Sequence, residues 1–182
     1  MALTKETEDF IASWKNAATS FTDKANVYDM FSKFSALVHI YNRLYNEVSV
    51  RIGKPQRDQD GATRHVVEYL TANDLAASIN GKNETREAEL QLKDFIKNHT
   101  YHFELAGEQR VPSDADDDLI LSDMESPNNK TRMEGLLYLI YKVRCNFVHG
   151  QKHHVPEQLP LMHAVIPILE LVISNTEEKL RV

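Results

Sequence analysis

The residues most suited to chemistry lie in one short stretch, where an arginine, an asparagine and a histidine fall within six positions: Arg144-Cys145-Asn146-Phe147-Val148-His149-Gly150. A guanidinium group stabilises negative charge on phosphate oxygens. An imidazole takes up or releases a proton near neutral pH. The combination of Arg144 and His149 therefore indicates chemistry on a phosphodiester.

These groups must be positioned by the amphipathic helix that carries them. At 100° per residue, Arg144 lies about 20° from Met133 on the helical wheel. It therefore falls within an apolar stripe formed by Met133, Leu136, Leu137, Ile140, Phe147 and Val148. An unpaired buried charge is expensive. The position predicts either a structural ion pair with a carboxylate or an anion-binding arginine at a crevice or subunit interface.

His149 lies about 140° from Arg144 on the same wheel, so the two cannot converge on a continuous helix. Asn146 and His149 are three residues apart and can converge. One possibility is that the helix ends near Gly150, which suits the C′ position, so that the His149 side chain turns back toward Arg144. The other possibility is that two chains form one site around a two-fold axis.

The remaining elements also have helical periodicity, and no alternating strand pattern competes with it. The strongest signal runs from Phe31 to Val48, before Gly53 and Pro55 end it. We expect an all-α, single-domain helical bundle over residues 1–182, with about six helices. They are expected near 10–21, 31–48, 62–79, 84–99, 131–148 and 157–179.

Charge is unevenly distributed along the chain. The net charge of −6 argues against a broad nucleic-acid surface. Residues 104–125 hold eight acidic side chains against Arg110 alone, whereas residues 130–154 hold five basic side chains against Glu134. We interpret 104–129 as an acidic insert that forms a solvated loop.

Composition indicates a globular protein of a reducing cytoplasm. Cys145 is the only cysteine, so no disulfide within the chain is expected. The start of the chain has no apolar run typical of a signal peptide. The longest apolar stretch, Leu161 to Ile173, is short and interrupted by polar residues, so no membrane span is expected.

Two spacings resemble metal sites. The first spacing would align three metal ligands on one helix, but Gly150 is expected to interrupt that helix. The second spacing is that of a calcium-binding loop, except that Leu119 occupies the position where such a loop requires glycine. The residues of the first are Cys145, His149 and His153, and those of the second are Asp114, Asp116, Asp118 and Glu125. We expect no metal and no cofactor.

The stretch Arg144 to Gly150 resembles the Arg-x4-His motif of the HEPN superfamily, small all-helical proteins that include many metal-independent ribonucleases of toxin, defence and RNA-processing systems. The segment Tyr41-Asn42-Arg43-Leu44-Tyr45-Asn46 is similar to an asparagine-containing helix of some bacterial members. The resemblance covers the helical layout of most of the chain. HEPN toxins that are paired with nucleotidyltransferase antitoxins often carry a tyrosine two places after the motif histidine, where this chain has Gln151.

This resemblance implies a homodimer whose two motifs share one cleft and which cleaves RNA by attack of the 2′-hydroxyl, leaving a 2′,3′-cyclic phosphate. His149 would act as general base or acid and Arg144 would stabilise the phosphorane. Asn146 would orient His149 or hold phosphate. Substrate-binding candidates are Lys142, Lys152, Asn42 and Tyr45, of which the last two suit a hydrogen bond inside the core equally well. An antitoxin or regulatory protein would be a further partner.

The alternative is a non-catalytic HEPN-like module that dimerises and binds a partner protein or a nucleotide. A positive cleft around Arg144 and His149 in a dimer would favour the nuclease. A buried Arg144 paired with an acidic residue of its own chain would favour the module.

Overall fold

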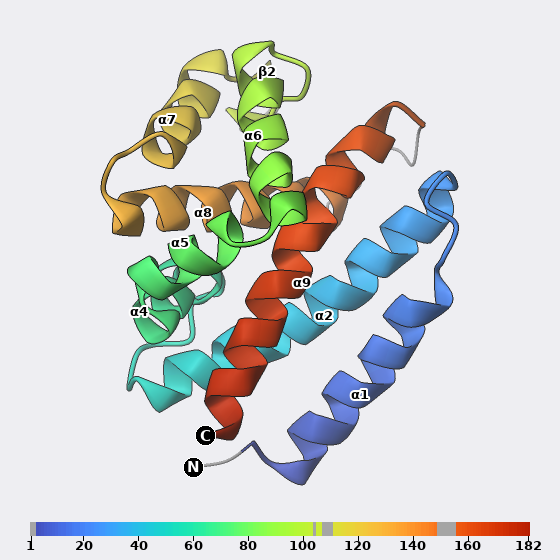
Figure 1. Cartoon of the computed structure of the whole chain (residues 1–182), viewed down its shortest axis with the longest axis vertical. Coiled ribbons are helices and arrows are strands. Elements are labelled where there is room, and N and C mark those ends of the chain that lie inside the picture. Colours follow the sequence, from blue (N-terminus) through green and yellow to red (C-terminus); the bar gives the residue numbers. More distant parts are fainter. Residues whose placement is uncertain (1–2, 104, 107–110, 149–155) are drawn as a thin grey trace.

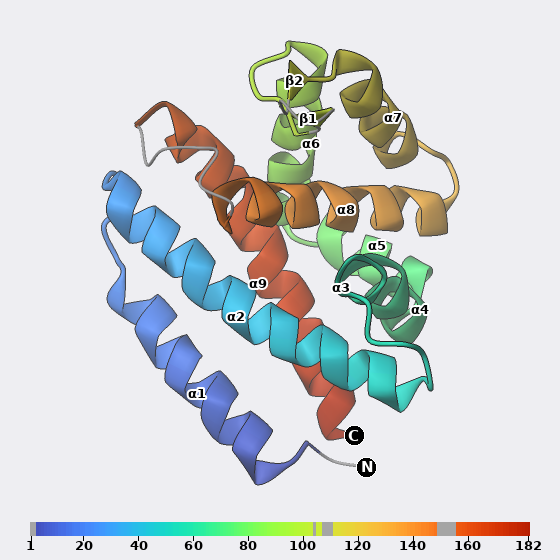
Figure 2. The same ribbon diagram turned by 180° about the vertical axis from the view of Figure 1, so that it is seen from behind.

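The computed structural model describes residues 3–103, 105–106, 111–148 and 156–182, and over these ranges it confirms an all-α fold. Three long helices form one layer: α1 (Lys5–Ser20), α2 (Val27–Arg51) and α9 (Leu159–Arg181). Both ribbon views show α2 between α1 and α9 (Figures 1 and 2). The long α8 (Asn129–Val148) crosses the end of this layer, with α6 (Asn83–Lys97) and α7 (Asp114–Met124) beyond it.

The segment with the strongest helical periodicity, 31–48, lies within the central helix α2. Asn26 caps α2, because its side chain accepts hydrogen bonds from the backbone N–H groups of Tyr28 and Asp29. The predicted apolar face of this helix is buried throughout and comprises Phe31, Phe34, Leu37, Val38, Tyr41, Leu44, Tyr45 and Val48. Packing against both α1 and α9 explains why this face is so long.

The third predicted helix, over 62–79, is instead broken into several short elements. These are α3 (Asp58–Asp60), the π-helical turn η1 (Gly61–His65), α4 (Val66–Leu70) and α5 (Ala72–Asn80). Thr71 adopts a φ of 68°, which a continuous right-handed helix does not allow. The count of about six helices is therefore too low for the described residues. The other predicted helices lie within a few residues of α6, α8 and α9.

Gly61 allows η1 to approach α2 closely. A Cβ at this position would lie 2.8 Å from Cδ2 of Tyr45. The hydroxyl of Tyr41 donates a hydrogen bond of 2.6 Å to the carbonyl of Ala62, and Ser49 Oγ lies 2.8 Å from Nδ1 of buried His65. The wide turn is thus fixed to α2 by hydrogen bonds as well as by packing.

The acidic insert is not simply a solvated loop. Its first described part forms a short antiparallel pair, β1 (Leu105–Ala106) with β2 (Val111–Pro112), and its second part forms α7. Ser113 caps α7, and three aspartates in its first turn complement the positive end of the helix dipole. Ile120 and Met124 are buried. The residues with the calcium-loop spacing, Asp114, Asp116 and Asp118, belong to this helix and do not form a loop.

The last helix supplies much of the core. The stretch Pro156–Arg181, a short 3-10 turn η2 (Pro156–Gln158) followed by α9, is long and apolar enough to cross a membrane by length and composition alone. In this fold 61% of its most apolar window is buried. Its apolar side chains contact α2 and α6, as expected of a core helix.

Replacing Gly135 by alanine tests the close approach of α7 to α8. A Cβ there would lie 2.7 Å from Cβ of Asp123 and 3.1 Å from the backbone nitrogen of Met124. Alanine inside a helix normally stabilises by about 0.5–1 kcal/mol relative to glycine. We expect the opposite sign here, a loss of about 1–3 kcal/mol, because the helices must separate. Urea unfolding measures the free energy, and a stabilised Gly135→Ala variant would contradict the packing.

Candidate functional site

Arg144 lies in the last turns of α8, on the inner stripe that the helical wheel predicted. Its side chain is 20% exposed, whereas Met133, Leu136 and Ile140 on the same stripe are buried. Its Nη1 donates a hydrogen bond of 3.1 Å to Oδ2 of Asp58, in α3. The first of the two predicted outcomes, an ion pair within one chain, is therefore present.

Asp58 is held from a second side by Tyr45. The Tyr45 hydroxyl donates a hydrogen bond of 2.8 Å to Oδ1 of Asp58, while its ring is buried in α2. Burial, and next the bond to Asp58, raise the pKa of Tyr45 far above its ordinary range. Tyr45 therefore remains a neutral donor and fixes the carboxylate that holds Arg144.

The guanidinium keeps donor capacity beyond its bond to Asp58. Nε of Arg144 is buried and has no hydrogen-bond partner among the described residues. Burial lowers the pKa of Arg144, but Tyr45 and Asp58 raise it by more, so the net pKa lies above its ordinary value. The Tyr141 ring lies 5.7 Å from the guanidinium carbon. Burial and a hydrogen bond with Cys145 raise the pKa of Tyr141 to about 12.

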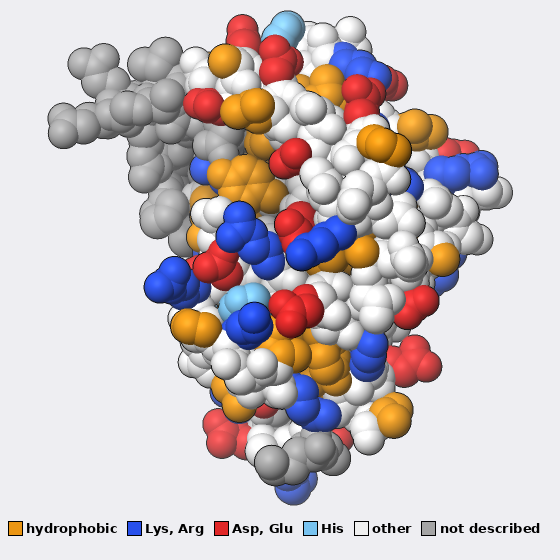
Figure 3. Space-filling view, turned by 90° about the vertical axis from the view of Figure 1, so that its left-hand side faces the viewer, with side chains coloured by type: hydrophobic (Ala, Val, Ile, Leu, Met, Phe, Trp, Pro, Cys, Tyr) orange, Lys and Arg blue, Asp and Glu red, His pale blue; other side chains and the backbone are white. Residues whose placement is uncertain are grey.

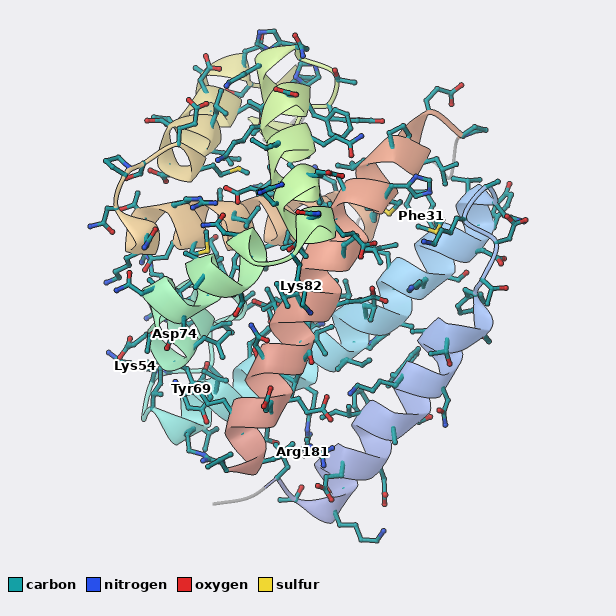
Figure 4. The ribbon with its side chains drawn as sticks, in the orientation of Figure 1. Phe31, Lys54, Tyr69, Asp74, Lys82 and Arg181 are labelled. Carbon is teal, nitrogen blue, oxygen red and sulfur yellow. The ribbon has the colours of Figure 1, made fainter. Side chains whose placement is uncertain are left out.

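Arg144 also lines a cavity of about 270 Å³ between α2 and the end of α8. Its lining is Phe31, Phe34, Ser35, Val38, His39, Asn42, Arg144 and Phe147. Figure 4 places Phe31 near the N-terminal end of α2, and its ring meets that of Phe147 with centroids 4.5 Å apart. The wall is thus partly aromatic, and its polar groups come from Ser35, His39, Asn42 and Arg144.

The predicted substrate-binding residues of α2 separate into two roles. Asn42 is half-buried and shares the cavity with Arg144, as the prediction required of a cleft residue. Tyr45 is not among the residues of this cavity and instead makes a part-buried hydrogen bond to Asp58, close to the alternative of a bond inside the core. Its contribution is to position Asp58.

Asn146 is buried and makes a structural hydrogen bond. It is 5% exposed, and its Nδ2 donates a hydrogen bond of 3.1 Å to the carbonyl of Phe103. That bond ties α8 to the segment that follows α6. The expected role of Asn146 in orienting His149 or binding phosphate has no support in this geometry.

The other predicted residues lie on or beyond the end of α8. The ammonium of Lys142 lies 5.7 Å from the centroid of the Tyr138 ring and makes further interactions. His149, Gly150, Lys152 and His153 lie outside the described residues. The predicted convergence of His149 with Arg144 therefore stays a prediction, as does the Cys145-His149-His153 spacing.

Sequence reasoning missed Asp58 and His39. Asp58 lies in the polar stretch that follows Pro55, where no spacing distinguishes it from Asp60. His39 is exposed on α2, stacks on Trp14 with centroids 4.2 Å apart and also lines the cavity. Its three-residue distance from Asn42 was the only signal that could have grouped it with the site.

The face of the molecule in Figure 3 carries mixed rather than strongly basic charge. On the face in Figure 3, Lys and Arg side chains alternate with Asp and Glu, and no broad patch of one sign is visible. A larger cavity of about 540 Å³ lies between α1, α2 and α9, but it contains none of the predicted site residues. The case for a site therefore depends on Arg144 and its surroundings.

Comparisons with protein-family models, curated proteins and solved structures found no match for this chain.

Asp58→Asn tests whether the carboxylate holds Arg144. Asparagine cannot neutralise the guanidinium and loses part of the hydrogen bonding to Tyr45 and Arg144. We expect the free energy of unfolding to fall by about 1–2 kcal/mol. Asp60→Asn is the matched control, since Asp60 pairs with an exposed arginine, Arg64, at 3.4 Å and should cost at most about 1 kcal/mol. If the two substitutions lower the free energy of unfolding equally in chemical denaturation, the Asp58–Arg144 pair is no more stabilising than an exposed ion pair.

Proposed function

We propose that this protein is a metal-independent endoribonuclease of HEPN type, active as a homodimer in a toxin or defence system. It would cleave RNA by attack of a 2′-hydroxyl on the adjacent phosphate, giving a 2′,3′-cyclic phosphate and a free 5′-hydroxyl. The Arg144–His149 motif is the source of the proposal, and the surroundings of Arg144 support it.

The observation that carries the proposal is the state of the Arg144 side chain. It is fixed by Asp58 through Nη1 alone, lines a partly aromatic cavity with Asn42, and retains Nε without a partner among the described residues. A guanidinium held in place loses little freedom when it binds an anion. Aromatic walls suit the stacking of unpaired RNA bases.

In the proposed reaction, His149 accepts the proton of the 2′-hydroxyl as its oxygen forms a bond to phosphorus. Arg144 stabilises the additional negative charge of the phosphorane through hydrogen bonds to its oxygens. The bond from phosphorus to the 5′-oxygen then breaks, and that oxygen takes up a proton. This scheme requires a dimer if His149 of one protomer and Arg144 of the other act on the same phosphate. Lys142 and Lys152 would attract the RNA backbone.

A second candidate is a non-catalytic dimeric module that binds a partner protein or a nucleotide. The intrachain pair of Arg144 with Asp58 favours it, because a partly buried arginine with its own carboxylate has a sufficient structural reason to be there. The mixed surface charge in Figure 3 agrees with this candidate as well.

Cleavage of a labelled RNA in EDTA distinguishes the two candidates. We expect the wild type to cut and to leave a 2′,3′-cyclic phosphate, with a loss of at least about 100-fold in Arg144→Ala and in His149→Ala. Arg64→Ala removes an exposed arginine that also pairs with an aspartate and should retain full activity. Circular dichroism and light scattering establish that each variant is folded and show its oligomeric state.

Two results would reject the nuclease. If the folded wild type cuts none of a varied set of RNAs, the binding module becomes the better account. If Arg144→Ala and His149→Ala cut as well as the wild type, the activity does not belong to this site. A monomeric wild type that cleaves RNA would reject the shared dimeric cleft while leaving the chemistry in place.

A further inference from the structure

A histidine and two aspartates come together between the end of α6 and the start of α7, beside Phe103, whose carbonyl accepts the hydrogen bond of Asn146. Nδ1 of His102 lies 3.3 Å from Oδ1 of Asp114 and 3.6 Å from Oδ2 of Asp117. One donor atom from each of the three residues lies within 4.8 Å of the other two. Figure 1 shows α6 and α7 side by side beyond α8.

The separations are too long for the hydrogen bonds that the same groups would make. A charge-assisted N–H···O bond spans about 2.7–2.9 Å. Nδ1 of His102 is buried and makes no hydrogen bond within the described part of the chain, although it faces two carboxylates. Two ligands of a tetrahedral ion with bonds of about 2.0–2.2 Å lie roughly 3.3–3.5 Å apart. The two distances from His102 are within the range of an ion pair, and they also match two edges of a coordination shell.

The groups are also fixed in the way that metal ligands are fixed. Asp117 is 2% exposed, and both of its oxygens accept from the backbone N–H of Phe103, at 3.0 and 3.2 Å. Outer hydrogen bonds of this kind orient the carboxylates that bind metal ions. Asp114 is exposed at the first residue of α7, so the site remains open to solvent on one side.

His99 lies beside Asp114 but outside the group of three whose donor atoms are within 4.8 Å of one another, so it would have to move closer to serve as a fourth ligand. Its Nδ1 lies 3.5 Å from Oδ1 of Asp114. It follows the C-cap residue Asn98 with a φ of 48°, while Thr100 N–H bonds to the carbonyl of Phe95 and His99 N–H to that of Ile96. This Schellman motif normally ends in glycine at the position of His99. The backbone thus aims an imidazole at the cluster from a position where a side chain is uncommon.

We propose that His102, Asp114 and Asp117, with His99, bind one divalent transition-metal ion, best fitted by zinc. Imidazole nitrogen selects zinc and its neighbours over magnesium and calcium. Two carboxylates balance the charge of the ion. The ion would tie the end of α6 to the start of α7 and so close the chain between them into a loop. This site is separate from Arg144 and does not rest on the proposed ribonuclease.

Titration of the metal-free full-length protein with zinc chloride tests the site. We expect one zinc per chain by calorimetry and a higher melting temperature in its presence. His102→Ala and Asp114→Asn should each weaken binding by about tenfold or more. Asp118→Asn makes the same charge change at an exposed position of α7 outside the cluster and should leave the affinity unchanged.

Two further variants separate the sources of binding. His99→Gly suits the backbone at that position, so a weaker zinc affinity with an unchanged fold identifies His99 as a ligand. Unchanged binding removes His99 from the set. A triple change of His149, His153 and His154 to alanine removes the other histidine-rich stretch. Zinc binding that this triple variant abolishes, or that His102→Ala leaves intact, overturns the proposal, and so does the absence of any binding by the wild type.

Discussion

The pairing of Arg144 with Asp58 is the constraint on which the arrangement around the candidate site depends. A guanidinium on the inner stripe of a helix loses much of its hydration, and an unpaired charge there would be strongly unfavourable. Asp58 removes that penalty only because a short helical segment brings it to the end of α8. The hydroxyl of Tyr45 fixes the carboxylate from within α2, so three elements converge on one charge.

The irregular segment between α2 and α4 follows from the same requirement. A regular helix over 62–79 would not provide the wide π-helical turn that seats Gly61 against Tyr45. Single π-turns are often found at functional sites, because they redirect side chains within a helix. Here the turn begins three residues after Asp58, and Tyr41 and Ser49 of α2 form hydrogen bonds with it.

The sequence predicted those features that depend on local periodicity. The eight-residue apolar face of α2 and the inward position of Arg144 were both predicted from spacing. Partners distant in sequence could not be predicted, since nothing near Asp58 indicates that α8 packs beside it. Asn146 shows the opposite limit, because its place inside a motif suggested chemistry while the fold uses its amide to hold Phe103. The helix α7 within the acidic insert was not predicted, because its many acidic residues indicated a solvated loop. Ile120 and Met124 are buried in a helix that packs against α8, a contact that no local pattern indicates.

The most direct test of the account is whether the guanidinium of Arg144 contacts a nucleic-acid phosphate, which the Nε–H signal of this residue reports. Its resonance in a ¹⁵N–¹H spectrum is assigned by comparison with Arg144→Lys and followed as an uncleavable 2′-deoxy oligonucleotide is added. We expect this signal to shift and saturate, while that of Arg132, whose Nε is bound to Glu89, stays in place. If the oligonucleotide saturates the protein without moving the Arg144 signal, or does not bind, Arg144 serves only its ion pair and the proposed nuclease site is contradicted.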